Sequence, residues 1–195
     1  VVYGARLLRR SPAFTLLAAG VLSLGIGVNL IVVYVLTGFA DRFDGIEQVR
    51  SIYSLSWTVN GRPYRLTVGD FQSLVTQNPM FSDILAEQRA SLVETRTSSA
   101  VSAGFVTGNY FAALGVKPSL GRLLADFDTS NSGSPVAVLA HWYWQQGHGG
   151  DPSIVGKSLR LNQRVVQVVG VAPPGFDGLT LLRTAVWLPF TLHEP

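Results

Sequence analysis

The sequence contains no cysteine and few charged residues. Without cysteine the chain cannot form disulfides, thiolate metal sites or a cysteine nucleophile, so any domain outside the cytoplasm must be stabilised by its core alone. Charged residues make up 14% of the chain, against about 25% in typical soluble domains. None of them lies between Arg10 and Asp41. The shortage of charge is therefore concentrated near the N-terminus, and the chain from about residue 41 onward has the composition of an ordinary soluble domain.

The chain also lacks an excess of positive charge outside its first ten residues. The net charge is +3, and Arg6, Arg9 and Arg10 supply all of it, because the remaining twelve Lys and Arg equal the twelve Asp and Glu. This balance argues against a nucleic-acid partner, which would need a basic face on the folded domain. Three arginines directly before an apolar run instead follow the positive-inside rule. That rule predicts a cytoplasmic N-terminus, with the chain after the run outside the cytoplasm.

A continuous apolar run extends from residue 14 to residue 39, which is longer than the roughly 20 residues that cross a bilayer. We predict a transmembrane helix over residues 13–40, with Ser11-Pro12 as its N-cap and first helical position. Residues 1–12 mix apolar and basic side chains, as a cytoplasmic interfacial segment does. A signal peptide is one alternative, but its apolar region spans about 7–15 residues and residues 37–40 form a poor cleavage site. A buried helix of a soluble protein is the other alternative.

Small residues recur on one face of this predicted helix. Ala19, Ser23 and Gly27 are spaced by four residues, and small side chains at that spacing let another helix approach closely. We therefore predict that this face contacts other transmembrane helices, although Gly is also simply frequent in such helices. Asn29 is the only strongly polar residue in the span. It either bonds to another helix or lies near a helix end, and the sequence does not decide between the two.

Residues 41–195 consist of short apolar segments divided by turn residues, without a regular strand–helix alternation, which favours the α+β class. Asn60-Gly61 predicts a hairpin of residues 49–59 and 62–66, with Pro63 on an edge strand. Asp70 is the predicted N-cap of a helix that ends near Gln77. The further predicted elements are a broken β-pattern over 84–106, a helix over 108–115 closed by Gly115, a strand over 136–139, a helix over 141–146, a hairpin of 159–161 with 165–171, and a last strand over 185–189.

Gly156-Lys157-Ser158 matches the end of the phosphate-binding P-loop, G-x-x-x-x-G-K-[S/T]. The first glycine of that motif would fall at residue 151, which is Asp151. A carboxylate there would repel the phosphate that the loop must hold with backbone N–H groups. A strand and a turn follow Lys157 instead of a helix. We therefore predict no nucleotide site, with Lys157 and Arg160 facing solvent and Leu159 and Leu161 facing the core.

No other pattern in the sequence indicates catalysis. His141, His148 and His193 have no histidine or carboxylate at metal-ligand spacing, so we expect surface or structural roles. The loop over 126–134, with Asp126 and Asp128, lacks the EF-hand pattern, and there is no Gly-x-Ser-x-Gly motif. We assign the aromatic residues 142–144 to core packing, with a ligand-stacking platform as the alternative. The chain is therefore predicted to be no enzyme and to hold no cofactor or metal.

Several segments resemble bacterial ABC-transporter permeases of the MacB/FtsX type, and most closely the large duplicated permeases abundant in acidobacteria. The first matches are Arg-Leu-Leu-Arg-Arg-Ser-Pro-Ala-Phe-Thr over residues 6–15 and Gly-Ile-Gly-Val-Asn over residues 25–29. The later matches, which follow in order along the chain, cover residues 104–122, 136–144, 149–162, 168–176 and 186–189. One segment departs from the family pattern, because residues 36–44 lack the proline pair that usually links the helix to the outer domain.

The resemblance implies that residues 41–195 are a MacB-like periplasmic core domain inserted after the first membrane helix, and that the domain is incomplete at its C-terminus. It implies a permease subunit in the bacterial inner membrane that works with a separate cytoplasmic ATPase, where ATP would bind. Further permease helices would complete a homodimer or pseudo-dimer. The outer domain would move with the ATPase cycle and act on substrates or partner proteins in the periplasm. The alternative is a single-pass anchored binding module without a transport role, and an enzyme comes third.

Overall fold

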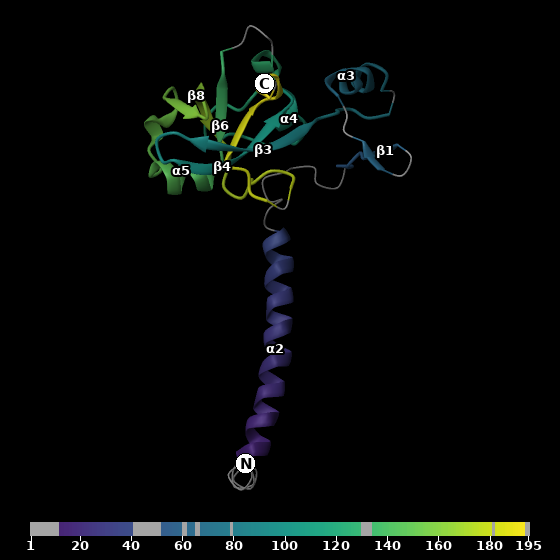
Figure 1. Ribbon diagram of the computed structural model, residues 1–195, viewed down its shortest axis with the longest axis vertical. Helices are drawn as coiled ribbons and strands as arrows, with labels where there is room; N and C mark the ends of the chain where they lie inside the picture. The colour runs from purple at the N-terminus through teal and green to yellow at the C-terminus, as the bar shows by residue number, and fades with distance from the viewer. Residues whose placement is uncertain are drawn as a thin grey trace. The chain divides into compact units, whose positions relative to one another are not determined.

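The computed structural model describes residues 12–40, 52–59, 62–64, 67–78, 80–129, 134–180 and 182–193. By its contacts the chain divides into two compact units, Val1–Asp41 and Arg42–Pro195, and each is described by itself. Figure 1 shows the helix of the first unit and the strands and short helices of the second. The outcome matches the predicted class, an N-terminal apolar helix followed by a mixed α/β domain.

The first unit contains one helix, α2 (Pro12–Ala40). Proline is well tolerated at the first helical position because its missing N–H would have no intrahelical partner there. Within α2, residues Thr15–Tyr34 form the one segment of the described chain that is long and apolar enough to cross a membrane. Twenty residues rise about 30 Å, which matches the hydrocarbon thickness of a bilayer. None of that apolar window is buried inside the structure, as expected of a helix that faces lipid.

A small β-hairpin and a helix begin the described part of the second unit. Strand β1 (Trp57–Val59) pairs antiparallel with β2 (Arg62–Tyr64), as the hairpin prediction requires, although residues 52–56 are not in a strand. The turn residues 60 and 61 lie outside the described residues. Helix α3 (Val68–Thr76) follows. The sequence predicts Asp70 as the N-cap of this helix, and that prediction is wrong. Thr67 is the N-cap, and Asp70 completes a capping box with it, because a Thr three residues before an acidic side chain satisfies two helix-end N–H groups at once.

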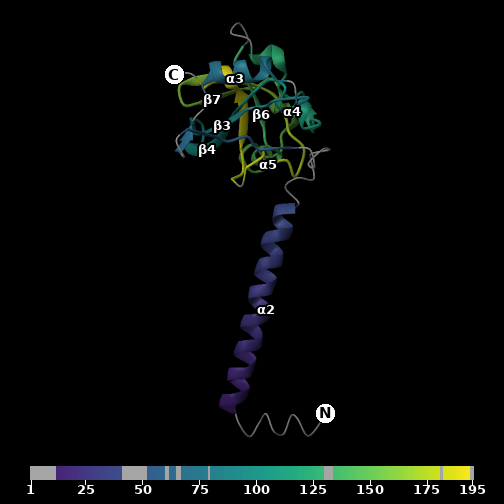
Figure 2. The same cartoon turned by 90° about the vertical axis from the view of Figure 1, so that its right-hand side faces the viewer.

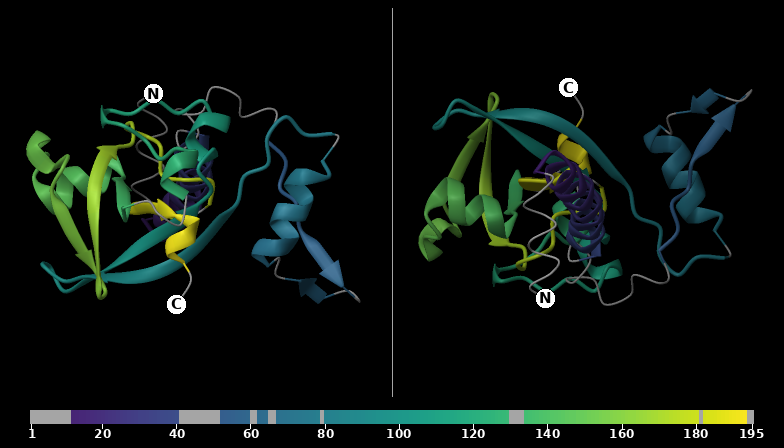
Figure 3. Two further views of the ribbon diagram at one scale, coloured as in Figure 1. Left: turned by 90° about the horizontal axis from the view of Figure 1, so that it is seen from above. Right: turned by 90° about the horizontal axis from the view of Figure 1, so that it is seen from below.

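Six strands of the second unit close into a barrel. Their order is β8-β6-β9-β4-β3-β7, and β7 pairs again with β8 to complete the ring. The pairs β4–β9 and β6–β8 are parallel and the other pairs are antiparallel. The strands, drawn in Figures 2 and 3, are β3 (Glu87–Glu94), β4 (Ser99–Val106), β6 (Val136–Leu139), β7 (Ser158–Leu161), β8 (Arg164–Val171) and β9 (Val186–Pro189).

Strand β8 closes the barrel because it pairs with neighbouring strands along both of its edges. Its first half pairs with β7, and its second half pairs with β6 and with the short strand β5 (Leu120–Gly121). The close approach of β5 requires glycine at position 170. A Cβ atom there would lie 2.1 Å from the carbonyl oxygen of Arg122 and 2.7 Å from that of Leu120. No side chain fits in that space.

Two short helices and the barrel strands surround one hydrophobic core. Helix α4 (Tyr110–Ala113) buries Tyr110 and Phe111, and helix α5 (His141–His148) buries Tyr143. Trp187 is fully buried in this core, with its ring centroid 5.5 Å from that of Phe111 and 5.3 Å from that of Phe176. Such offset and edge-to-face pairs add to the stabilisation from buried area. The remaining short elements are the 3₁₀ turns η3 (Asp126–Thr129), η4 (Pro152–Ile154) and η5 (Phe190–Leu192).

Candidate functional sites

The predicted helix-contact face lies on α2. Ala19 and Ser23 are exposed and Gly27 is half-buried, and a Cβ atom on Gly27 would meet no other atom within 4 Å. This stripe therefore has room for a neighbouring helix. Asn29 does not lie near an end of α2, and its Nδ2 donates to the carbonyl of Gly25 one turn earlier, at 2.9 Å. A bond from Asn29 to another helix stays a prediction. The predicted topology residues Arg6, Arg9 and Arg10 lie outside the described residues.

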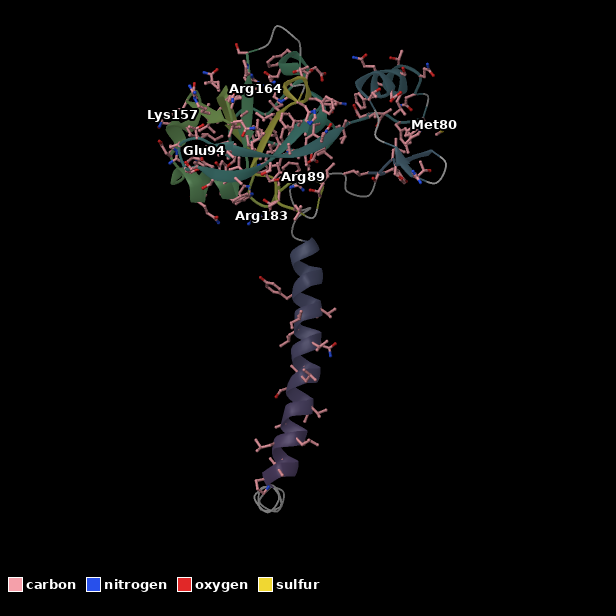
Figure 4. The ribbon with its side chains drawn as sticks, in the orientation of Figure 1. Met80, Arg89, Glu94, Lys157, Arg164 and Arg183 are labelled. Carbon is pink, nitrogen blue, oxygen red and sulfur yellow. The ribbon has the colours of Figure 1, made fainter. Side chains whose placement is uncertain are left out.

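An open apolar depression lies between β1, α3 and the chain that follows α3. It encloses about 520 Å³, and its apolar lining is Leu55, Trp57, Leu74, Met80, Phe81 and Ile84. Met80 is 79% exposed, and Figure 4 labels it beside these elements. Asn78 shapes the turn here, since its Oδ1 accepts from the backbone N–H groups of Met80 and Phe81, both at 2.9 Å. The sequence alone did not point to this surface, because its apolar residues lie on separate elements.

The Gly-Lys-Ser segment forms a surface ion pair. The ammonium group of Lys157 lies 2.9 Å from Asp151 Oδ2, and both side chains are about half exposed. Asp151 also accepts from the backbone N–H and the hydroxyl of Ser153, so this carboxylate caps η4. The hydrogen bond from Lys157 is the largest cause that lowers the pKa of Asp151. The residue that breaks the P-loop motif is thus the partner of its lysine.

Strand β7 also shows the predicted alternation that follows the Gly-Lys-Ser segment. Leu159 and Leu161 are buried and Arg160 is exposed, so the prediction for these three residues is confirmed.

The acidic residues after Leu124 also form protein contacts. The guanidinium group of Arg122 donates to both oxygens of buried Asp128, at 2.6 and 2.8 Å, and Asp128 accepts from the N–H of Ala125. The same guanidinium stacks over Phe127 at 4.8 Å. Asp128 is therefore a structural group. Over the described ranges of the chain, no three His, Asp or Glu side chains gather as metal ligands would.

A buried carboxylate joins the β3–β4 hairpin to α5. Glu94 is 1% exposed and accepts from the hydroxyl groups of Tyr143, at 2.7 Å, and Thr97, at 2.9 Å. Arg96 forms an ion pair with it at 3.2 Å and donates to the carbonyl of Gly147. Burial acts to raise the pKa of Glu94, but these hydrogen bonds and the nearby charge outweigh it, and the pKa is lowered. Figure 4 labels Glu94 within the barrel domain.

A second carboxylate lies at the other end of β3. Tyr110 donates its hydroxyl to Glu87 Oε2 at 2.8 Å, and burial is the main cause that raises the pKa of Glu87. Arg89 donates to Ser102 Oγ at 2.6 Å and to the carbonyl of Leu182 at 2.7 Å. These contacts hold the segment before β9 against β3 and β4. No sequence motif indicated them, because their members are far apart in the chain.

The aromatic residues and histidines around α5 pack as predicted. Tyr143 is buried, and Trp142 and Trp144 are partly buried against the core. Both indoles donate to backbone carbonyls, Trp142 to that of Thr184 at 3.0 Å and Trp144 to that of Asp151 at 2.9 Å. The three histidines, His141, His148 and His193, each contact an aromatic ring. These side chains serve packing, which is the role the sequence favoured.

Comparisons with known proteins agree with this architecture. The family model for the MacB-like periplasmic core domain matches residues 15–194, which include most of α2. None of the curated proteins matches the chain. The periplasmic region of MacB from Actinobacillus actinomycetemcomitans is similar in fold, with a TM-score of 0.52 and 21% identity, covering 73% of this chain and 58% of that one. The extracellular domain of YknZ, a noncanonic ABC-type transporter from Gram-positive bacteria, has a TM-score of 0.53 and 18% identity, covering 65% and 64%.

The present chain therefore spans about three-fifths of each of these solved domains. At identities near 20% the likeness is one of fold, and the family match supplies the relationship. It extends over both the apolar helix and the barrel domain, and it confirms the resemblance found in the sequence motifs. The chain belongs to the family of MacB-like periplasmic core domains, which are non-catalytic domains of membrane permeases.

Proposed function

We propose that this chain is part of the permease subunit of an ABC-type transporter, and that its outer domain couples a separate cytoplasmic ATPase to work on substrates or partner proteins outside the inner membrane. The observation that carries this proposal is the family match over residues 15–194, because it covers the apolar helix and the outer domain together. ATP would bind to the ATPase, in agreement with a Gly-Lys-Ser segment that forms a surface ion pair. No nucleic-acid partner is proposed.

The complete gene and its neighbours provide the first test. A permease predicts three or more further apolar spans downstream and an adjacent ATPase gene. Purified in a lipid nanodisc, the permease should bind that ATPase and raise its rate of ATP hydrolysis. A gene product with α2 as its single span, and no ATPase that binds it, would contradict the proposal. It would favour the alternative, an anchored binding module, for which the exposed apolar lining of the β1–α3 depression is the supporting observation.

The proposed orientation places residues 1–12 in the cytoplasm, residues 13–40 in the bilayer and residues 41–195 in the periplasm. Arg6, Arg9 and Arg10 would set this topology, since basic residues beside a span are retained in the cytoplasm, where they would also lie near anionic lipid or the ATPase. Because these 195 residues contain no cysteine, labelling of a single introduced cysteine reports the location of that position alone. A cysteine at exposed Ser56 should react with a membrane-impermeant maleimide in spheroplasts. Labelling only after lysis would overturn the orientation.

The face of Ala19, Ser23 and Gly27 is proposed to contact other helices of the transporter. Single cysteines at these positions should form disulfide cross-links in membranes with cysteines placed on the partner helix or on a second copy. Val21 points away from this face by helical geometry and is 66% exposed, so Val21→Cys is the matched control. Equal cross-linking at Val21 and Ser23 would show that the helix has no preferred contact face.

A further inference from the structure

The hairpin of β1 and β2 has one protected edge and one open edge. Strand β2 contains the exposed Arg62 and also Pro63, and charge and proline are means by which natural edge strands avoid pairing with other chains. Residues 52–59, which lead into and form β1, include no charged residue, no proline and no glycine. Within the part of the chain that the structure describes, β1 pairs only with β2. Its second edge, here called the open edge, is therefore available to another strand.

The pairing of β1 with β2 shows which backbone groups face the open edge. Thr58 lies opposite Pro63. Proline has no N–H, so this pair cannot be one in which two residues exchange both backbone hydrogen bonds. The N–H and C=O of Thr58 therefore point away from β2, and in an extended chain the same holds for every second residue. Residues 52–56 run into β1 without a helix, turn or bend, which places the backbone groups of Ser54 and Ser56 on the open edge as well.

One face of this segment is apolar and exposed. Tyr53, Leu55 and Trp57 alternate with small hydroxyl side chains, so they share one face of the extended chain. They are 74%, 48% and 41% exposed, respectively. Leu55 and Trp57 also line the depression beside α3, whereas no described residue of β2 does. Figures 1 and 3 show β1 and α3 to one side of the barrel. A second strand on the open edge would cover apolar surface that the described chain leaves exposed.

We propose that the open edge of β1 pairs with the same edge of a second copy of this chain, antiparallel and with the two-fold axis at Leu55. In this register Ser54 of each copy forms a hydrogen-bonded pair with Ser56 of the other. Tyr53 lies opposite Trp57 in pairs without backbone hydrogen bonds, where side chains come closest, and aromatic pairs of this kind stabilise sheets. Since the segment has no charge, no like charges meet across the axis. The segment is therefore complementary to itself.

The size of this contact fits two copies held in one membrane. Residues 52–58 of each copy pair in this register, which is far fewer than the roughly 20–30 residues per side of a standard interface. The contact would therefore be weak between copies free in solution. Anchoring by α2 raises the effective concentration of the second copy and so favours the pairing. The inference thus rests on the membrane anchoring proposed above but not on the ATPase, and it applies to a permease and to an anchored module alike.

Cysteine cross-linking of the full chain in bacterial membranes tests the proposal, because the sequence has no cysteine of its own. Leu55→Cys places two thiols opposite each other across the axis, at a Cα separation that suits a disulfide. Oxidation with copper phenanthroline should therefore give a disulfide-linked dimer of this variant. An adduct of Leu55→Cys with a different protein, in place of the dimer, would assign the open edge to another partner and overturn the proposal.

Tyr53→Cys is the matched control for the register. Tyr53 is more exposed than Leu55, but in the proposed register it lies opposite Trp57 and not opposite its own copy. Tyr53→Cys alone should therefore give little dimer, whereas Tyr53→Cys expressed together with Trp57→Cys should give a cross-linked pair. Random collision would instead cross-link the most exposed position best. Dimer yields at residue 53 that equal those at residue 55 overturn the proposal.

Two further measurements support the cross-linking. Ser56→Pro removes an N–H from the open edge without removing a hydrogen bond of the described chain, so it should abolish the Leu55→Cys dimer, whereas Ser56→Ala should retain it. On the unaltered chain, backbone hydrogen exchange over 52–58 should be about tenfold slower in vesicles with many copies than in nanodiscs with one copy, if the edge is paired nine-tenths of the time. Equal exchange overturns the proposal. A chain that carbonate washes from membranes overturns the anchoring too, whereas an anchored chain without the residue-55 dimer overturns this inference alone.

Discussion

Replacing Tyr143 by phenylalanine tests how the hairpin of β3 and β4 is held to α5. The change removes one hydroxyl group and keeps the buried ring. That hydroxyl donates to Glu94 Oε2 at 2.7 Å, and Glu94 is 1% exposed, so water cannot replace the lost bond without opening the structure. The carboxylate keeps Thr97 and Arg96 as partners. Tyr143→Phe therefore isolates one charge-assisted hydrogen bond in a buried setting.

The expected loss follows from the charge and burial of the acceptor. A hydrogen bond to a charged group contributes about 1.5–3 kcal/mol to stability. Because Glu94 keeps its other partners, we expect a loss in the lower half of that range, about 2 kcal/mol. For a domain of 150–250 residues each kcal/mol shifts the melting temperature by about 2–4 °C. We therefore expect Tyr143→Phe to lower the melting temperature at pH 7 by about 4–8 °C.

Thermal unfolding followed by near-ultraviolet circular dichroism, on the full chain in detergent, measures this shift. Tyr53 is 74% exposed, so Tyr53→Phe is the matched control and should shift the melting temperature by less than about 2 °C. The pKa of Glu94 is lowered in the folded state, so its stabilisation is present above pH 4.5 and is lost as the pH falls through the folded pKa. The difference in melting temperature between wild type and Tyr143→Phe should therefore become smaller as the pH falls through the folded pKa of Glu94. A Tyr143→Phe melting temperature within about 2 °C of wild type at pH 7 would refute the reasoning.

Three further predictions use the same assay. Lys157→Ala should leave the fold intact and shift the melting temperature by less than about 2 °C, because the ion pair of Lys157 with Asp151 is exposed. ATP binding can be measured by calorimetry without any ATPase subunit. If the wild type binds ATP and this variant does not, our interpretation of the Gly-Lys-Ser segment is wrong. Gly170→Ala should cost about 3 kcal/mol or prevent folding, since its Cβ would lie 2.1 Å from a carbonyl oxygen; wild-type stability would show that β5 moves freely. Burial raises the folded pKa of Glu87 above 4.5, so wild-type stability should fall as the pH rises through that pKa, whereas Glu87→Gln should show no such fall, and identical pH profiles would contradict the burial argument.

Local patterns predicted the short-range elements well. The strand over 136–139 and the helix beginning at His141 are confirmed, because a buried strand and its flanking turn are visible within a few residues. The hairpin around Asn162-Gln163 is confirmed too, and Asn162 takes the left-handed backbone conformation, with φ of 53°, that asparagine tolerates in tight turns. The prediction of Asp70 as N-cap was wrong by three residues. In the capping box Thr67 and Asp70 exchange hydrogen bonds, and only the geometry shows that Thr67 is the residue before the helix begins.

The sequence by itself determined the apolar span, the class of the outer domain and its family, since each is written in the order and spacing of neighbouring residues. Only the tertiary structure decided how the strands close into a barrel and which buried polar groups meet. Tyr143 lies 49 residues from Glu94, and Arg89 lies 93 residues from Leu182, to whose carbonyl it donates. No local pattern encodes such pairs. They become partners because strand register and close packing place them together, and burial then makes each hydrogen bond between them matter.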